Sequence, residues 1–188
     1  MSQQQEIRLA GFGGQGIILS GHILGKAAAL FEQKNAVFTQ SYGPEARGGS
    51  CSADVVISDA TIHYPKVRKP DILVLMSQGA LATYGSVISP EGLMIVDEDL
   101  VTLNEDPPGI TVYRVPFTRM AEELGRSIVA NIVMLGALTA LGQVATYDSM
   151  RESVLSSIPP GTEDLNISAF DKGFEYGRKI LRKPAANC

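Results

Sequence analysis

The chain has 188 residues, of which 45% are hydrophobic and 19% charged, so one domain can bury roughly 70% of its unfolded surface without cross-links. Sixteen lysines and arginines against twenty aspartates and glutamates leave a net charge of −4, without the basic face of a nucleic-acid-binding protein. Two cysteines, Cys51 and Cys188, and two histidines exclude a disulfide framework and are too few for an iron–sulfur cluster or a structural zinc site.

The first elements are predicted to be a strand, a glycine turn and a helix. Residues 1–6 are polar and lack the basic, apolar and small-residue order of a secretory signal, so we expect the protein in the cytoplasm. A strand at 7–10 leads into Gly11-Phe-Gly-Gly-Gln-Gly16, and a long apolar-periodic run typical of a helix follows. Further strands are predicted at 36–40 and 51–57, separated by a loop of chain-bending residues at 41–49.

The remaining pattern predicts three strands and then mostly helices. Apolar runs indicate strands at 71–76, 92–97 and 111–115, with a turn at 106–109 before the last of them. Ser77 should cap a helix that runs to about Val87, and later helices are expected at 118–124, 128–144, 147–156 and about 167–181. Together the elements predict an α/β fold: a Rossmann-like, open, mostly parallel sheet with helices on both faces. No repeat or linker divides the chain, so we expect a single domain over 1–188.

The segment 127–147 carries no charge and could be mistaken for a membrane span. Polar residues interrupt it, at Asn131, Thr139, Gln143 and Thr146, so its fully apolar stretch is shorter than a bilayer is thick. We therefore expect a helix that is buried, either in the core of this chain or against another subunit.

The glycine turn fits a nucleotide-binding pattern, because backbone amides at a helix N-terminus can hold a phosphate. A nicotinamide site also needs an acidic residue at the end of the second strand, and residues 36–41 contain none. The structural alternative is that the glycines only permit a tight turn and close packing of helix on sheet.

No catalytic group is predicted in this chain. The segment Gly21-His-Ile-Leu-Gly25-Lys26 lacks the magnesium-binding hydroxyl and the spacing of a P-loop. His22 is expected on a polar helix face and His63 in a strand or turn, and no serine lies in a nucleophile elbow.

Two motifs together resemble the gamma subunit of the 2-oxoacid:ferredoxin oxidoreductases. They are Gly11-Phe-Gly-Gly-Gln-Gly-Ile-Ile18 and Thr39-Gln-Ser-Tyr-Gly-Pro-Glu-Ala-Arg-Gly-Gly-Ser50, the second followed by Ser52-Ala-Asp-Val-Val-Ile57. The resemblance extends over nearly the whole chain, and the wording of residues 40–47 is most similar to the 2-oxoglutarate (KorC-like) branch. Pyruvate, branched-chain and indolepyruvate enzymes carry similar domains.

The resemblance implies a subunit that is non-catalytic alone. In this family the holoenzyme decarboxylates a 2-oxoacid on thiamine diphosphate with magnesium, passes electrons through iron–sulfur clusters to ferredoxin, and releases an acyl-coenzyme A. Those cofactors are expected on partner chains, the alpha and beta subunits, with a ferredoxin-like delta subunit left open. No nucleic acid and no membrane are expected as partners.

Coenzyme A is the ligand that this chain is expected to help bind, through the glycine turn and the 41–49 loop. The candidate cofactor-binding residues are Gly11, Gly13, Gly14, Gln15, Gly16, Tyr42, Arg47 and Gly48. Arg47 supplies a cation suited to phosphate, but it could equally pair with Glu45 or with an acid of a partner. Two other possibilities stay open here: a free-standing nucleotide-binding oxidoreductase with a nicotinamide or flavin, and a purely architectural subunit.

Overall fold

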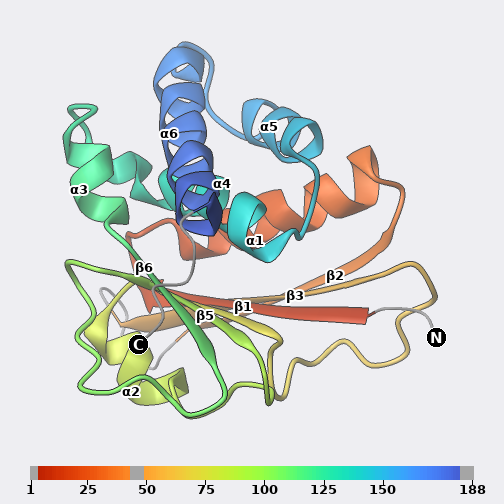
Figure 1. Cartoon of the computed structure of the whole chain (residues 1–188). Coiled ribbons are helices and arrows are strands. Elements are labelled where there is room, and N and C mark those ends of the chain that lie inside the picture. Colours follow the sequence, from red (N-terminus) through yellow and green to blue (C-terminus); the bar gives the residue numbers. More distant parts are fainter. Residues whose placement is uncertain (1–3, 43–48, 183–188) are drawn as a thin grey trace.

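A computed structural model describes residues 4–42 and 49–182 of the chain, which form one six-stranded sheet with helices on both faces (Figure 1). The strands are β1 (Gln4–Phe12), β2 (Asn35–Tyr42), β3 (Ser50–Ser58), β4 (Ile72–Leu75), β5 (Leu93–Asp97) and β6 (Thr111–Val115), in the spatial order β2-β3-β1-β4-β5-β6. Every strand predicted from the sequence is present. The pairs β1–β4, β4–β5 and β5–β6 are parallel, whereas β3 is antiparallel to both β1 and β2. The sheet is therefore mostly parallel, as predicted, with one reversed strand inserted between β1 and β2.

The helices are distributed unequally between the two faces of the sheet. They are α1 (Ile17–Lys26), which continues into a π-helical turn (Ala27–Phe31), α2 (Gln78–Tyr84), α3 (Phe117–Glu122), a 3₁₀ turn (Ser127–Val129), α4 (Ala130–Gly142), α5 (Tyr147–Leu155) and α6 (Glu163–Arg182). Figure 1 shows α2 alone below the sheet and the others above it. Accordingly, a large apolar core lies under α1, α4, α5 and α6, and a smaller one under α2.

Two helix ends differ from the prediction by three residues or more. Ser77 caps α2 as expected, because its hydroxyl accepts a hydrogen bond from the Ala80 amide at 3.2 Å. The helix ends at Tyr84 rather than near Val87 because Gly85 follows, a residue that is unfavourable in a helix interior. Helix α6 begins at Glu163 rather than near residue 167, since acidic residues in its first turn favour the positive end of the helix.

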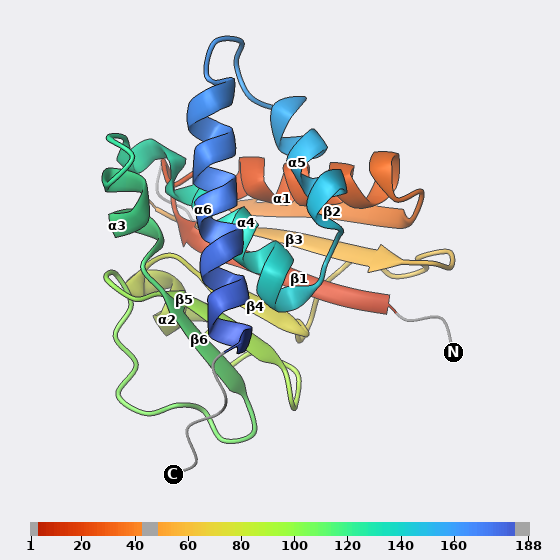
Figure 2. The same cartoon turned by 45° about the horizontal axis from the view of Figure 1, so that its top comes forward.

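Helix α4 is the centre of the larger core, with every residue from Ala130 to Leu141 buried. Helix α6 lies across it (Figure 2). The contact is backbone to backbone: a Cβ at Gly136 would lie 2.1 Å from the Phe170 carbonyl oxygen, and one at Gly173 would lie 2.0 Å from that of Val133. The uncharged helix is thus internal to this chain, and the alternative of a helix held against another subunit was wrong. No helix within the described ranges is long and apolar enough to cross a membrane.

Candidate functional site

The glycine turn lies at the carboxyl end of β1, the edge where open α/β sheets usually bind ligands. Gly14 has a φ of 105° and Gly16 a φ of 74°, backbone conformations that other residues rarely adopt. A Cβ placed on Gly14 would have no atom within 4 Å. The backbone at Gly14 is therefore open to an approaching group, as a phosphate-binding turn requires.

The N-terminus of α1 presents unpaired amides to the same edge. Gly16 is the N-cap and has no side chain to supply a capping bond. The first bond into the helix runs from the Ser20 amide to the Gly16 carbonyl at 2.9 Å, and the Ser20 hydroxyl donates to the same oxygen at 3.0 Å. The amides of the first helical turn, which come before Ser20, are left without intrahelical acceptors and carry the positive end of the helix dipole.

Gln15 and Gly11 shape the turn from within. The Gln15 carboxamide accepts a hydrogen bond from the Phe12 amide at 2.9 Å and donates one to the Met76 carbonyl at 2.7 Å, so it ties the turn to the end of β4. Gly11 is buried, and a Cβ there would lie 2.4 Å from the Gln15 amide oxygen. Gly11 and Gln15 were both predicted as cofactor-binding residues. The contacts observed for them lie within the fold and stabilise the turn.

The second predicted motif is described only in part. Tyr42 ends β2 and is 64% exposed. It pairs with Cys51 of β3, which in turn pairs with Gly11, so one strand separates Tyr42 from the glycine turn. The Gly13 amide donates to the Gly49 carbonyl at 2.9 Å, which joins the two motifs directly. Arg47, Gly48 and Glu45 lie outside the described residues.

Sequence reasoning missed Asn131, which it treated only as an interruption of an apolar run. Asn131 is the second residue of α4, and its side chain packs against Gly16. A Cβ at Gly16 would lie only 2.5 Å from the Asn131 amide nitrogen. The signal available in the sequence was a single carboxamide in an otherwise apolar helix.

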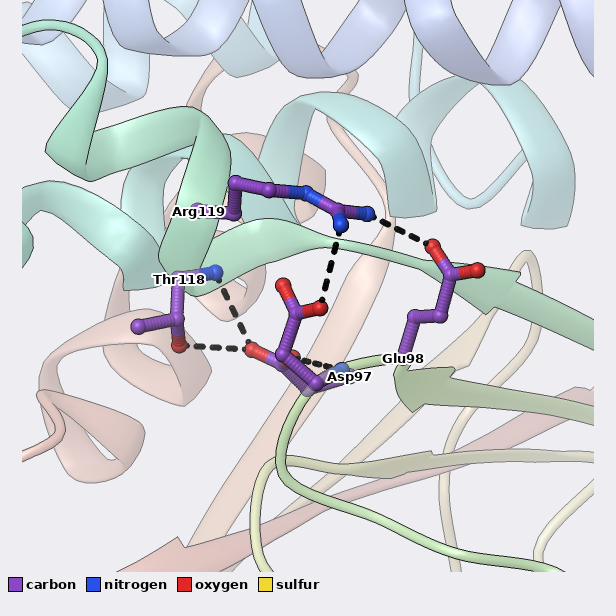
Figure 3. A network of polar contacts seen from close by, with 5 residues as sticks. Asp97, Glu98, Thr118 and Arg119 are labelled. Atoms are coloured by element: carbon purple, nitrogen blue, oxygen red, sulfur yellow. Dashed lines mark hydrogen bonds and ion pairs between the residues drawn. The ribbon is translucent and has the colours of Figure 1, made fainter.

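A second polar cluster lies at the ends of β5 and β6 (Figure 3). The buried Asp97 carboxylate accepts hydrogen bonds from the Thr118 amide at 3.1 Å, the Thr118 hydroxyl at 2.7 Å and the Asp99 amide at 3.0 Å. Arg119 pairs with Glu98 at 3.0 Å and with Asp99 at 3.4 Å near the surface. One oxygen of Asp97 fixes the start of α3 and the other fixes the turn after β5, so this carboxylate has a structural role.

A half-buried ion pair lies on the other side of the sheet, the face that α2 covers. Arg8 of β1 donates two hydrogen bonds of 2.7 Å to Asp54, its directly paired neighbour in β3. The bond to Asp54, which outweighs the effect of burial, raises the pKa of Arg8 above its usual value. The Arg8 guanidinium also donates to the Val67 carbonyl at 2.9 Å and lies 5.0 Å from the Tyr84 ring centre. Because Arg8 engages both carboxylate oxygens of Asp54, the pair joins β1 to β3.

A cavity of about 620 Å³ lies at the opposite edge of the sheet, at the amino ends of β4 and β5. Two of the polar side chains that line it are engaged within the fold: Asp71 accepts a hydrogen bond from the Glu6 amide at 2.8 Å, and Gln5 donates to the Gly142 carbonyl at 3.4 Å. Within the described ranges, no three histidine, cysteine, aspartate or glutamate side chains gather closely enough to hold a metal ion. The glycine turn, with its open backbone at Gly14 and the uncapped N-terminus of α1 beside it, is the better candidate for a ligand.

Comparisons of this sequence and fold with known proteins lead to one family of enzymes. Residues 6–176 match the family described as pyruvate ferredoxin/flavodoxin oxidoreductase. The 2-oxoglutarate synthase subunit KorC of Methanocaldococcus jannaschii is 54% identical over 182 residues, which cover 96% of this chain and 97% of that one.

Two solved structures share the fold. The gamma subunit of a keto/oxoacid ferredoxin oxidoreductase from Geobacter sulfurreducens is 40% identical, with a TM-score of 0.82 over 93% of this chain and 99% of that one. A 2-oxoglutarate:ferredoxin oxidoreductase from Magnetococcus marinus, with 2-oxoglutarate, coenzyme A and succinyl-CoA bound, is 25% identical. Its TM-score is 0.86, and the match covers 98% of this chain but 32% of the Magnetococcus chain.

Proposed function

Because the chain belongs to the pyruvate ferredoxin/flavodoxin oxidoreductase family, we propose that it is the gamma subunit of a 2-oxoglutarate:ferredoxin oxidoreductase. The observation that carries this proposal is the 54% identity to a 2-oxoglutarate synthase subunit over nearly the full length of both chains. The Magnetococcus structure, whose bound molecules are the oxoacid, the acyl acceptor and the acyl product of one such reaction, agrees with it.

The chain works together with other subunits. In the Magnetococcus enzyme, the matching region is 32% of a longer chain, which supports a domain that acts beside others. The partners proposed are alpha and beta subunits, with a ferredoxin-like delta subunit in some assemblies. Together they release CO₂ from 2-oxoglutarate, transfer the acyl group to the thiol of coenzyme A and pass the electrons set free to ferredoxin. Thiamine diphosphate, magnesium and the iron–sulfur clusters are assigned to the partners, and no step of this chain involves them.

The share of this chain is to hold the anionic part of coenzyme A. Gly14 and Gly16 offer backbone amides at the N-terminus of α1, and anions bind favourably there, whereas the Gly13 amide is already bonded to the Gly49 carbonyl. Tyr42 adds an exposed aromatic surface one strand away, and Arg47 adds a cation that suits phosphate. The protein thus orients the acyl acceptor and leaves bond-making to its partners.

The test uses the complex purified with its natural partners. Arg47→Ala should raise the KM for coenzyme A about ten- to a hundredfold, which corresponds to the loss of one charge-assisted hydrogen bond. Gly14→Ala should raise it as well, because a methyl group would fill the open backbone surface. Gly109→Ala is the matched control: Gly109 also has a positive φ, 75°, and open space around it, but it lies in a turn before β6.

The KM for 2-oxoglutarate should stay within about twofold in all three variants. An intact complex in which Arg47→Ala and Gly14→Ala both leave the KM for coenzyme A unchanged would remove this edge from the coenzyme A site. A complex that turns over pyruvate or a branched-chain oxoacid in preference to 2-oxoglutarate would overturn the substrate assignment.

A further inference from the structure

The connection between β3 and β4, residues 59–71, carries a cluster of positive charges. Lys66, Arg68 and Lys69 all lie in it and are exposed, and no residue of 60–70 is acidic. In the part of the chain that the structure describes, none of these three cations forms an ion pair. The segment is thus a basic loop on a chain whose net charge is −4.

The basic loop is held in place by its main chain and not by its charged side chains. Arg8, on the face of the sheet that α2 covers, donates to the Val67 carbonyl at 2.9 Å. The Ser89 hydroxyl donates to the Lys69 carbonyl at 2.8 Å, and the Ser89 amide to the Pro70 carbonyl at 2.9 Å. Val67 and Pro70 are buried, whereas the residues between them are exposed. The loop therefore has a fixed course, with its cations directed to solvent.

Tyr64 adds an aromatic surface to the basic loop. It is 48% exposed, and its hydroxyl accepts a hydrogen bond from the Arg68 guanidinium at 3.2 Å. The same guanidinium lies 5.1 Å from the Tyr64 ring centre, so ring and cation hold each other in position. Glu6 lines the small cavity beside them, together with Lys66. One carboxylate against three cations leaves this surface positive.

The basic loop lies far from the proposed coenzyme A edge. Ser58, the last residue of β3, pairs with Gln4, the first residue of β1, so the loop starts at the amino end of β1 (Figure 1). The glycine turn follows the carboxyl end of the same strand. A protein bound at the loop would therefore leave the glycine turn open.

An acidic protein that binds and leaves fits this surface best. A nucleic acid needs a longer track of cations to neutralise successive phosphates. A permanent subunit interface is large and apolar at its centre, whereas Tyr64 is the one large hydrophobic side chain that is exposed in this loop. Transient electron-transfer encounters bury less surface, and charge complementarity governs how fast they form.

We propose that the basic loop is a docking surface for an acidic face of ferredoxin. This inference rests on the proposed function, in which ferredoxin is the protein that must arrive and leave as electrons are passed on. Exposed charges held in fixed positions speed the encounter of oppositely charged proteins and orient it. The loop steers and holds ferredoxin, and the electrons come from the partner subunits without passing through this chain.

The decisive variant is Lys66→Gln/Lys69→Gln in the assembled complex, supplied with 2-oxoglutarate and coenzyme A. Ferredoxin from the same organism and the small dye methyl viologen are compared as electron acceptors. At low ionic strength, kcat/KM for ferredoxin should fall about five- to tenfold, because removing surface charges slows association. The kcat at saturating ferredoxin and the kcat/KM for the dye should stay within about twofold. In about 0.5 M salt the variant and the wild type should converge, because salt screens exposed charges.

Lys179→Gln/Arg182→Gln is the matched control. It removes the same charge from exposed side chains at the end of α6, which lies over the opposite face of the sheet (Figure 1). The kcat/KM of this variant for ferredoxin should stay within about twofold of the wild type. Lys66→Glu/Lys69→Glu reverses the charge of the loop and should lower kcat/KM for ferredoxin further than the glutamine variant does.

An unchanged kcat/KM for ferredoxin, an equal loss with both acceptors, or a loss that persists in about 0.5 M salt would overturn the inference. Separation of the loop variants from the alpha and beta subunits would do so too, because the loop would then be a permanent subunit contact. So would binding of a DNA oligonucleotide that depends on these lysines while the ferredoxin kinetics stay unchanged.

The failure of this inference is distinct from the failure of the proposed function. If the wild-type complex reduces ferredoxin and the loop variants do so equally well, only the docking surface is wrong. If the wild-type complex reduces no ferredoxin in the presence of 2-oxoglutarate and coenzyme A, the proposed function itself is wrong.

Discussion

Replacing Gly173 by alanine tests whether the close contact of α4 and α6 holds the larger core together. A Cβ at Gly173 would lie 2.0 Å from the Val133 carbonyl oxygen and 2.8 Å from its carbon. Ordinary carbon–oxygen contacts are about 3.3 Å or longer, so the two helices would have to separate by roughly an ångström. The obstacle is backbone, which cannot move aside as a flexible side chain can. The same shift would loosen the neighbouring contact of Gly136 with Phe170.

Two opposing effects decide the size of the change. Alanine favours a helix over glycine by about 1 kcal/mol, whereas overpacking of this kind costs about 1–3 kcal/mol and occasionally more. The clash is against backbone and would also open gaps along α4, so we expect its cost to lie at or above the upper end of that range. We therefore expect Gly173→Ala to lower the free energy of unfolding by about 2 kcal/mol. For a chain of this size, that corresponds to a fall in Tm of about 4–8 °C.

Thermal unfolding of the purified chain, followed by far-ultraviolet circular dichroism, measures this change. Gly79→Ala is the matched control because Gly79 also lies within a helix, α2, but a Cβ there would have no atom within 4 Å. Only the helix preference remains at that position, so the control should raise Tm by about 1–4 °C. A Gly173→Ala protein as stable as the wild type, or stabilised like the control, would refute the reasoning.

Two further predictions concern single ionisable groups. Burial raises the pKa of Glu32, but the hydrogen bond from the Thr146 amide and the pairing with Lys34 outweigh it, so its pKa is lowered. The Glu32 carboxylate therefore stabilises the fold above the unfolded pKa of about 4.3, and this stabilisation is lost below it. Glu32→Gln should be less stable than the wild type by about 1 kcal/mol at pH 6. In unfolding curves measured at acid pH this difference in stability should disappear, and a difference independent of pH would contradict the prediction. Burial raises the pKa of the Cys51 thiol. In a Cys188→Ser protein at mildly alkaline pH, a thiol reagent should therefore react with folded Cys51 at least about ten times more slowly than after unfolding in urea. Equal rates would show that Cys51 is accessible in the folded protein.

The strands were predictable, but the direction of β3 was not recognised. A run of apolar residues shows that a strand is buried and says nothing of the way it runs. The relevant signal was the connection: only residues 43–49 lie between β2 and β3, and a parallel pair needs a crossover of about a dozen residues or more. The short loop therefore already favoured an antiparallel pair.

The position of the glycine turn was predictable because its strand and helix are neighbours in sequence. The roles of Gln15 and Asn131 were not, since each depends on a residue far along the chain. Gln15 contacts Met76 and Asn131 contacts Gly16. Local patterns of hydrophobicity do not predict contacts between residues so far apart in the sequence. The apolar character of α4 was clear, but only the glycines at its contact with α6 show that this chain itself provides the cover.

The order of the strands also bears on how the chain is made. β1 leaves the ribosome first, yet both of its neighbours, β3 and β4, are synthesised later. Helix α4 in turn remains without its main cover until α6 has emerged, at Glu163–Arg182. Domains whose contacts close late in synthesis expose apolar surface in the meantime. A nascent chain stalled before Glu163 would therefore carry α4, the most apolar helix of the fold, without its main cover.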